Sequence, residues 1–165
     1  MKRIYILHVG NLKEKYYTEA VLEYEKRLQG FCRIENIFIK EEAMPENPSE
    51  AQIRAAVNKE GGRIRDTLNS IGKQRIYKIA LCIEGKRMSS EKFASSICAD
   101  ELWNAYSGVA FIIGGSCGLS EEVKHICEQQ LSFSEMTFPH RLMRVILLEQ
   151  IYRGFSINAG NPYHK

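Results

Sequence analysis

The residues best suited to chemistry lie in a glycine turn at 114–118, which follows the apolar run Phe111–Ile113 and precedes Ser120-Glu121-Glu122. An apolar β-rich run, a glycine turn and a helix start together form a common ligand-binding arrangement. Glycines let the backbone approach a ligand, and a helix N-terminus presents free N–H groups. The turn therefore predicts a cofactor-binding site.

The same turn, Gly114-Gly115-Ser116-Cys117-Gly118, also matches the G-x-S-x-G nucleophile elbow of hydrolases. A triad would need an acid and then a histidine downstream, but both aspartates, Asp66 and Asp100, lie upstream. The remaining acids are Glu121, Glu122, Glu128, Glu135 and Glu149, and the histidines are His140 and His164. The chain is short for a hydrolase of this kind, and a plain tight turn is a further alternative. A Walker phosphate loop is excluded because no Gly-Lys-Ser/Thr sequence follows.

Two further segments could complete a site. Phe133 to His140 interleaves aromatic, small polar and methionine side chains before a helix that begins at a proline, which suits a planar ring held between apolar walls. An ordinary buried connection is the alternative. Near the C-terminus, Tyr163 offers a stacking ring, His164 titrates near neutral pH and Arg153 is a fixed cation. A solvated tail is the alternative for so polar an end.

Composition places the chain among ordinary globular proteins. It has 165 residues, 44% of them hydrophobic and 26% charged, which fits one domain. The formal net charge of +3 permits an anionic partner without requiring one. The longest apolar runs are too short to span a membrane, and Met1–Gly10 is typical of a strand and not of a signal peptide. We therefore expect a cytoplasmic protein without membrane contact.

The five cysteines predict neither disulfides nor a metal site. They are odd in number and contain no CxxC pair, which fits a reducing compartment. Cys117, His125 and Cys127 are the one cluster that resembles a metal site, but a second ligand pair is missing from the sequence. The thiols are expected to lie buried or on helix surfaces.

Hydrophobic periodicity predicts alternating strands and helices. Strands are expected at 3–9, 33–39, 76–83 and 109–113, and helices at 13–28, at 49–72, from 89, at 120–130 and from 139. Ser49 and Gln52 form a capping-box start, and Gly61-Gly62 should weaken that helix locally. The nearly continuous apolar strand Ile76–Ile83 suggests burial on both faces. The order predicts an α/β fold with a parallel core, helices on both faces, and ligand loops at the carboxyl ends of the strands.

The last helix differs from the others because Arg141–Arg153 is apolar on more than one face. Such a helix is covered on two sides. Its own sheet would cover one side, and either a second copy of the chain or the rest of the same chain would cover the other.

Five segments carry a resemblance to a known family. They are Leu81–Lys86, Phe111–Ser116, Leu131–His140, Met143–Arg153 and Pro162–Lys165, in this order along the chain. On these motifs the chain resembles the SPOUT-class methyltransferases that modify N3 of pseudouridine in large-subunit ribosomal RNA, the ribosomal RNA large subunit methyltransferase H family. Each motif alone is modest, whereas five in order are specific.

The resemblance implies a homodimer of single-domain chains, here residues 1–165, with a deep trefoil knot in the C-terminal half, an exception to the usual rarity of knots. It implies S-adenosylmethionine as the cofactor. By resemblance, the cofactor-binding residues are Leu81, Gly114, Phe133, Ser134, Glu135, Met136, Thr137 and Phe138. No role is assigned to Cys117.

The implied chemistry is methyl transfer to N3 of a pseudouridine in 23S ribosomal RNA. Donor and acceptor must be aligned within about 3 to 3.5 Å, and the proton on N3 must be removed or the resulting anion stabilised. His164 and Arg153 are candidates for these catalytic roles. Tyr163 could stack on the base once it is turned out of the RNA.

Basic residues gather late in the sequence, and a homodimer would double any patch that they form. They are His140, Arg141, Arg144, Arg153, His164 and Lys165. Because so small a chain carries no added RNA-binding domain, we expect it to recognise large-subunit RNA within the assembled ribosome. A module that binds a nucleotide-like ligand without transferring anything is the competing class.

Overall fold

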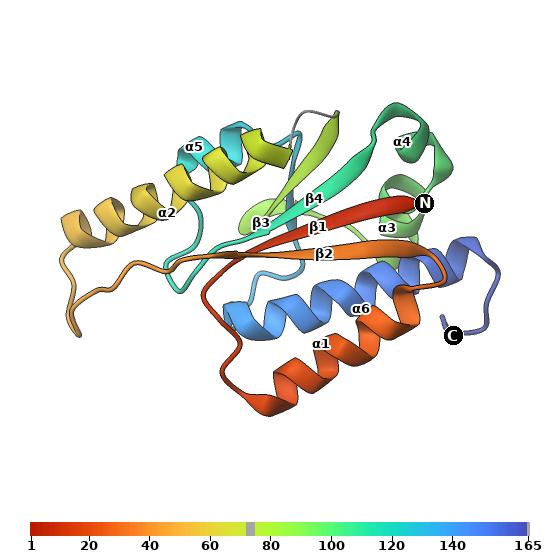
Figure 1. The fold of residues 1–165 in the computed structure, drawn as a ribbon, viewed down its shortest axis with the longest axis horizontal. Helices are drawn as coiled ribbons and strands as arrows, with labels where there is room; N and C mark the ends of the chain where they lie inside the picture. Colours follow the sequence, from red (N-terminus) through yellow and green to blue (C-terminus); the bar gives the residue numbers. More distant parts are fainter. Residues whose placement is uncertain (72–74, 165) are drawn as a thin grey trace.

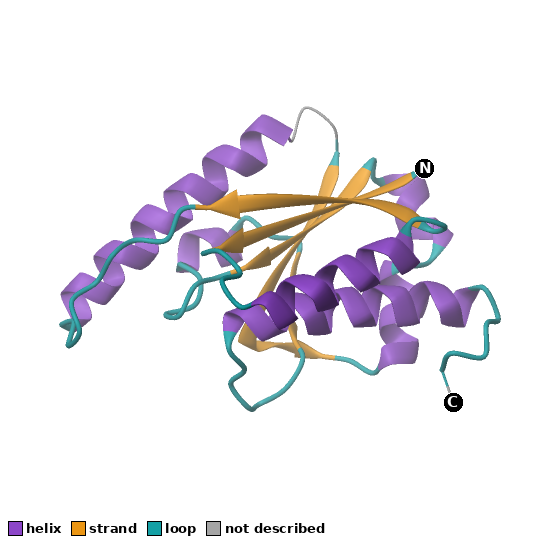
Figure 2. Cartoon of the chain, turned by 60° about the horizontal axis from the view of Figure 1, so that its bottom comes forward, coloured by secondary structure: helices purple, strands orange, loops and turns teal. Residues whose placement is uncertain are grey.

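A five-stranded parallel sheet runs through the molecule, with helices against both faces (Figures 1 and 2). The computed structural model describes residues 1–71 and 75–164. The strands are β1 (Lys2–Val9), β2 (Cys32–Ile39), β3 (Ile76–Arg87), β4 (Gly108–Ile113) and β5 (Gln129–Ser132). The helices are α1 (Lys15–Leu28), α2 (Glu50–Ile71), α3 (Ser90–Ile97), α4 (Asp100–Ala105), α5 (Glu121–His125) and α6 (His140–Asn158). The strand order is β2-β1-β4-β3-β5, and all four pairings are parallel.

Strand β4 is buried along its whole length because a separate core packs against each face of the sheet. Val109, Phe111 and Ile113 face the core that α1, α3 and α6 complete. Ala110 and Ile112 face the core that α2 and α5 complete. A strand covered on both sides has no polar face, which explains its continuous apolar sequence. The predicted α/β fold with a parallel sheet and helices on both faces is confirmed.

Strand β3 is longer than predicted and is interrupted by a bulge. Leu131 of β5 pairs with Leu81 and again with Lys86, so residues 82–85 stand out of the regular ladder. The register shift lets β3 continue to Arg87, beyond the predicted end at Ile83. The bulge therefore presents residues 82–84 at the edge of the sheet instead of burying them within it.

The predicted helix over 120–130 is wrong in its second half. Helix α5 ends at His125, and Gln129–Ser132 forms the edge strand β5 beside β3. Leu131 and Ser132 are buried in this position. Pairing with a strand far away in the sequence therefore outweighs a local pattern that could continue a helix.

The predicted helix from 89 is two helices. The Ser89 hydroxyl caps α3 by accepting the N–H of Lys92 at 3.2 Å. The helix ends at Ile97, and Cys98 is buried in the core against α6. Its thiol lies so close to Gly154 that a Cβ at position 154 would be 2.6 Å from the sulfur. Helix α4 begins only after this buried turn.

Helix α2 starts with the predicted capping box. Ser49 N–H donates to Gln52 Oε1 at 2.8 Å, and Gln52 N–H donates to Ser49 Oγ at 3.3 Å. Gly61-Gly62 do not interrupt the helix, which runs unbroken to Ile71. The predicted end at Gly72 lies outside the described residues.

Helix α6 packs between the sheet and α1, with α3 alongside (Figure 1). Phe31, which follows α1, stacks on Phe155 at 5.6 Å between ring centroids, and Asn158 Nδ2 donates to Ala94 O of α3 at 2.9 Å. Its own chain therefore covers more than one face of α6, so the apolar pattern does not by itself require a second copy. The trefoil knot stays a prediction. Within residues 1–71 and 75–164, no helix is long and apolar enough to cross a bilayer.

Candidate active site

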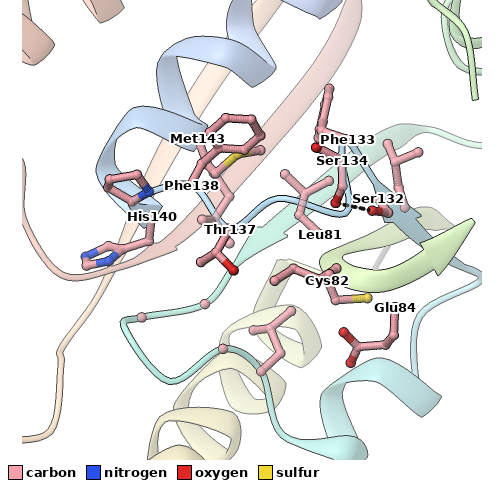
Figure 3. Close-up of a pocket in the computed structure, with 18 of the residues that line it drawn as sticks. Leu81, Cys82, Glu84, Ser132, Phe133, Ser134, Thr137, Phe138, His140 and Met143 are labelled. Carbon is pink, nitrogen blue, oxygen red and sulfur yellow. Dashed lines mark hydrogen bonds between the residues drawn. The ribbon is translucent and has the colours of Figure 1, made fainter. Parts of the chain in front are cut away.

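A pocket of about 700 Å³ lies at the carboxyl ends of β3 and β4 (Figure 3). The glycine loop 114–118 forms one wall, the β3 segment 81–84 forms a second and the segment 131–140 forms a third. Crevices at the carboxyl ends of parallel strands are the usual ligand sites of α/β proteins. The volume lies within the range of roughly 300 to 1,000 Å³ that is usual for small-molecule sites.

Seven of the eight residues that the resemblance assigned to the cofactor line this single pocket. They are Leu81, Gly114, Phe133, Ser134, Met136, Thr137 and Phe138. Glu135 does not line it, and its carboxylate instead pairs with Arg87 Nη1 at 3.0 Å on the surface. The structure thus gathers residues from three separate segments, and their part in binding stays a prediction.

Sequence reasoning missed other residues of the pocket. Cys82, Ile83 and Glu84 enter it from the β3 bulge, and Met143 enters from the first turn of α6. Figure 3 places Phe138 and Met143 at one side of the pocket and Cys82 and Glu84 at another. Cys82, Ile83 and Glu84 belong to the Leu81–Lys86 motif, which could have indicated them as pocket residues. The bulge that directs them toward the pocket could not be predicted from the sequence.

The glycine loop closes tightly on itself. A Cβ at Gly114 would meet the backbone of Gly118, and Gly118 N–H donates to Gly115 O at 3.1 Å. Gly118 has a φ of +79°, in the left-handed region that favours glycine. Ser120 then caps α5 by accepting the N–H of Val123 at 3.3 Å. Backbone atoms therefore line the pocket where side chains would otherwise fill it.

The loop after β5 is fixed by hydrogen bonds around Ser134. Ser132 Oγ donates to Ser134 O at 3.0 Å (Figure 3), and Met136 N–H donates to Ser134 Oγ at 3.0 Å. These bonds hold the turn that carries Phe133 and Phe138 into the pocket wall. Two aromatic walls with a nearby Thr137 hydroxyl form a suitable environment for a planar, polar-edged ring.

Glu84 and Lys124 bring an ion pair to the pocket. The Glu84 carboxylate pairs with Lys124 Nζ, which also donates to Glu121 at 2.8 Å. The hydrogen bond from Lys124 lowers the pKa of Glu84. Glu84 is therefore ionised at neutral pH, and its oxygens can accept hydrogen bonds from ligand hydroxyls or attract a cationic group.

His140 lies at the pocket edge with its Nε2 buried. Among the described residues, this atom has no hydrogen-bond partner. Burial lowers the pKa of His140, so the ring is neutral at physiological pH. The Nε2 atom faces Gly10, where a Cβ would lie 3.5 Å from it, so it points away from the pocket. Sequence reasoning had placed His140 in the Phe133–His140 segment, among the possible triad histidines and in the basic group.

The three residues predicted to be catalytic lie together at the C-terminus. Arg153 Nη1 donates to His164 Nδ1 at 3.2 Å. The guanidinium of Arg153 also lies over the ring of Tyr163, at 4.8 Å from its centroid. Glu149 accepts hydrogen bonds from Arg153 at 3.0 and 2.6 Å and from the Tyr163 hydroxyl at 3.3 Å. The resulting C-terminal cluster consists of Glu149, Arg153, Tyr163 and His164.

The C-terminal cluster is remote from the pocket of its own chain. None of its members is among the residues that line the pocket. Met143 of the pocket and Arg153 lie on the same helix, α6, ten residues apart, or roughly 15 Å at 1.5 Å per residue. Figure 1 shows the C-terminus at the far end of α6 from the loop that enters it. In a single chain the C-terminal cluster therefore lies outside the pocket.

The basic residues of α6 do not form one patch. Arg141 Nη1 pairs with Glu14 at 2.6 Å near the start of the helix, and Arg153 pairs with Glu149 near its end. Arg144 is half-buried, and burial lowers its pKa. Lys165, the last of the predicted group, lies outside the described residues.

The hydrolase and metal alternatives find no support in the described part of the chain. Ser116 Oγ has one side-chain hydrogen bond there, with Cys117 Sγ at 3.9 Å, and no histidine is hydrogen-bonded to it. Within residues 1–71 and 75–164, no group of three or more His, Cys, Asp or Glu residues is placed to hold a metal ion.

The parallel sheet and its three-walled pocket define a cofactor-binding α/β protein. A solved probable methylase family protein from Haemophilus influenzae shares the fold, with a TM-score of 0.56 over 99% of this chain and 70% of that one. The two sequences are only 11% identical, so this likeness shows the fold alone.

Sequence relatives give the family. The family described as "predicted SPOUT methyltransferase" matches residues 1–164. The chain is 47% identical over 162 residues to the ribosomal RNA large subunit methyltransferase H of Leuconostoc mesenteroides, covering 98% of this chain and 99% of the relative. It is 49% identical over 163 residues to the protein of the same name from Streptococcus thermophilus, covering 99% of both. The chain belongs to the SPOUT methyltransferase family, as its motifs predicted, and it is an enzyme that uses S-adenosylmethionine.

Proposed function

We propose that this protein methylates N3 of a pseudouridine in 23S ribosomal RNA, within the assembled ribosome in the cytoplasm, and that residues 1–165 act as one domain. The names of its relatives support a large-subunit ribosomal RNA substrate. The observation that carries the proposal is the pocket, because seven of the eight residues carried over from the family line one cavity.

The residues of the pocket fit S-adenosylmethionine. The glycine loop leaves backbone atoms exposed, Phe133 and Phe138 supply apolar walls, and Glu84 is ionised. When bound, the cofactor supplies an electrophilic methyl group on a positively charged sulfur. The described residues would hold the donor, exclude water and leave one side open for the acceptor base.

The C-terminal cluster fits the acceptor side of the reaction. Arg153 carries a permanent charge that would stabilise an anion at N3. Because Arg153 donates to His164 Nδ1, the proton of a neutral His164 lies on Nε2, which contacts Glu91 Oε1 at 2.8 Å. Both ring nitrogens are therefore engaged, and Nδ1 carries the free lone pair, so Arg153 must leave Nδ1 before His164 can accept the N3 proton. Tyr163 would stack on the base.

We further propose a homodimer in which the C-terminal cluster of one protomer completes the pocket of the other. The separation of roughly 15 Å along α6 supports this, because the structure of one chain holds the two parts apart. A twofold dimer would form two such composite sites.

Methyl transfer from labelled S-adenosylmethionine tests the reaction. Ribosomes lacking the modification would be incubated with the protein, and the labelled nucleoside would be identified by mass. Label on N3 of a pseudouridine in large-subunit RNA is expected. Label elsewhere, or none despite cofactor binding, would contradict the proposed substrate. Equal methylation of naked RNA fragments would contradict recognition of the assembled ribosome.

Mixed dimers test the composite site. A Gly114→Ala chain, defective in the pocket, would be unfolded, mixed and refolded with a chain lacking residues 163–165. Random pairing makes half of the dimers mixed, each with one intact site, so activity of about a quarter of the wild type is expected. At a concentration of S-adenosylmethionine well below the raised Kd of Gly114→Ala, each variant alone should be nearly inactive. A mixture as inactive as its components would show that pocket and tail act within one chain.

A further inference from the structure

Glu149 gathers the hydrogen-bond donors of the C-terminal cluster. Its Oε1 accepts from Arg153 Nε at 3.0 Å, from Arg153 Nη2 at 2.6 Å and from the Tyr163 hydroxyl at 3.3 Å. Its Oε2 accepts from Gln150 Nε2 at 2.6 Å. The Glu149 side chain is only 18% exposed, so these bonds are partly shielded from water. Glu149 is thus the one residue of the cluster that contacts both Arg153 and Tyr163 through the same oxygen.

We propose that Glu149 is a positioning residue for methyl transfer. It fixes Arg153 and Tyr163 relative to each other, so that the C-terminal tail, which carries Tyr163 and His164, meets the acceptor base in a preformed arrangement. This inference rests on the proposed function. Glu149 acts through its two partners and is not itself assigned a contact with the substrate.

The tail needs such a fixed point. Tyr163 lies near a chain end, where residues fray unless they are tied down, and an arginine side chain has several freely rotating bonds. A fork of two bonds from Arg153 to one carboxylate fixes the plane of the guanidinium. The third bond, from Tyr163, then sets the ring against that plane, at 4.8 Å from the guanidinium.

This arrangement leaves Arg153 able to act. A guanidinium has five N–H donors. Glu149 takes two of them and His164 takes one. Two N–H groups therefore remain with no protein partner among residues 1–71 and 75–164, and they can donate to an oxygen beside the developing charge on the base.

Glu149 is itself anchored to the start of α3. Ser90 Oγ donates to Gln150 Oε1 at 2.7 Å, and Gln150 in turn donates to Glu149. The next residue, Glu91, contacts His164 at 2.8 Å. Helix α3 begins three residues after β3 ends, so the segment that carries the bulge of the pocket continues directly into the anchor of the tail.

The test compares two Glu149 variants with a matched control. Glu149→Ala removes all the contacts, whereas Glu149→Gln keeps the shape and one acceptor oxygen. Asp66→Ala is the control, because Asp66 Oδ1 accepts from Arg65 Nε at 3.3 Å and Nη2 at 3.2 Å on the surface of α2, far from the tail. For each protein, kcat and KM on ribosomes, the Kd for S-adenosylmethionine and the thermal midpoint would be measured.

We expect Glu149→Ala to lower kcat by about 10- to 100-fold, the range that a misplacement near 1 Å produces. Glu149→Gln should lose less, and the Kd for S-adenosylmethionine should stay within twofold for both. Carboxypeptidase should also release C-terminal residues faster from Glu149→Ala than from the wild type. Asp66→Ala should match the wild type in every assay.

Two results would overturn the positioning role while the proposed function stands. One is a Glu149→Ala protein with wild-type kcat and an equally protected tail. The other is a Glu149→Gln protein, folded at the wild-type midpoint, that loses cofactor affinity together with kcat. A wild-type protein that transfers no methyl group to ribosomes would instead refute the proposed function. The carboxypeptidase assay would then still show whether Glu149 holds the C-terminal tail.

Discussion

Gly85 lies against the backbone of Leu131 so closely that a Cβ at position 85 would be 2.7 Å from both the carbonyl carbon and the nitrogen of Leu131. Real Cβ atoms do not approach a backbone to this distance. The close approach accompanies the bulge in β3, where Leu131 pairs with both Leu81 and Lys86. The missing side chain at Gly85 is therefore what lets the pocket wall fold back beside the edge strand.

Replacing Gly85 with alanine should separate β3 from β5 and deform the pocket. We expect Gly85→Ala to lower the free energy of unfolding by about 2 to 4 kcal/mol, as overpacking of a rigid contact does, and to weaken S-adenosylmethionine binding. Urea unfolding and calorimetric titration would measure the two effects. Gly30→Ala is the control, because a Cβ there meets nothing within 4 Å. A Gly85→Ala protein as stable as the control would contradict this account.

Gly114→Ala should act on the cofactor more than on the fold. A Cβ at this position would press on the backbone of Gly118 and force the glycine loop open, away from the bound ligand. We expect the Kd for S-adenosylmethionine to rise by at least tenfold while the sheet stays intact, because the loop lies beyond the end of β4. Calorimetry with circular dichroism as the control for folding would test this. An unchanged Kd would show that the loop does not contact the cofactor.

Strands with strong local patterns could be predicted from the sequence, whereas β5 could not. Val109–Ile113 is apolar throughout because two cores cover it, and such a run has few other interpretations. Gln129–Ser132 follows a short helix with no turn signal strong enough to end it. Its strand conformation comes from pairing with β3, about 50 residues away in the sequence, and a local pattern does not contain that information.

Part of the candidate site could likewise be predicted from the sequence, and part could not. The glycine loop and the segment Phe133–Phe138 were recognisable because their motifs are local and ordered. The role proposed for Glu149 could not be found by motif, because its partner Tyr163 reaches it only after the chain has turned back past the end of α6. The distance between the pocket and the C-terminal cluster could not be read from the sequence either, because it depends on α6 being one continuous helix from Met143 to Arg153.

Removing residues 163–165 should abolish turnover while leaving the fold intact. The truncation deletes Tyr163 and His164, whose side chains lie on the surface of α6 and α3, and it leaves both cores complete. We expect kcat to fall by more than 100-fold, which is the usual size of a lost acid–base contribution, with the Kd for S-adenosylmethionine unchanged. Single-turnover methylation of ribosomes would measure the loss. Turnover at the wild-type rate would remove the tail from the mechanism.

Stability should decrease on mild acidification because of His8. Burial and the nearby Arg144 lower the pKa of His8 to about 4, and its Nδ1–H donates to Gly10 O at 2.9 Å. An unfolded histidine has a pKa of about 6.5. Between about pH 6.5 and pH 4, the unfolded chain binds a proton that the folded chain does not, so the free energy of unfolding falls by on the order of 3 kcal/mol. Urea unfolding at a series of pH values would show this slope, and His8→Gln should flatten it. Parallel curves for the two proteins would exclude His8 as the cause.

The adjacent glycines of α2 should respond in opposite directions to the same substitution. Both lie inside a helix, where alanine is favoured over glycine by roughly 0.5 to 1 kcal/mol. A Cβ at Gly62 meets nothing within 4 Å, so Gly62→Ala should raise the free energy of unfolding by about that amount. A Cβ at Gly61 would instead overlap the hydroxyl of Ser120, which caps α5 and is buried.

Gly61→Ala should therefore lower stability by roughly 1 to 3 kcal/mol, because the gain in helix propensity is smaller than the overpacking penalty. The disturbance should also pass to Ser120, whose hydroxyl must move and weaken its bond to the N–H of Val123. The double variant Gly61→Ala, Ser120→Ala tests this directly, because removing the hydroxyl makes room for the new methyl group. We expect it to lose less stability than the two single variants predict together, by about 1 kcal/mol in a double-mutant cycle. Strict additivity would show that helix α2 and the cap of α5 do not pack as described.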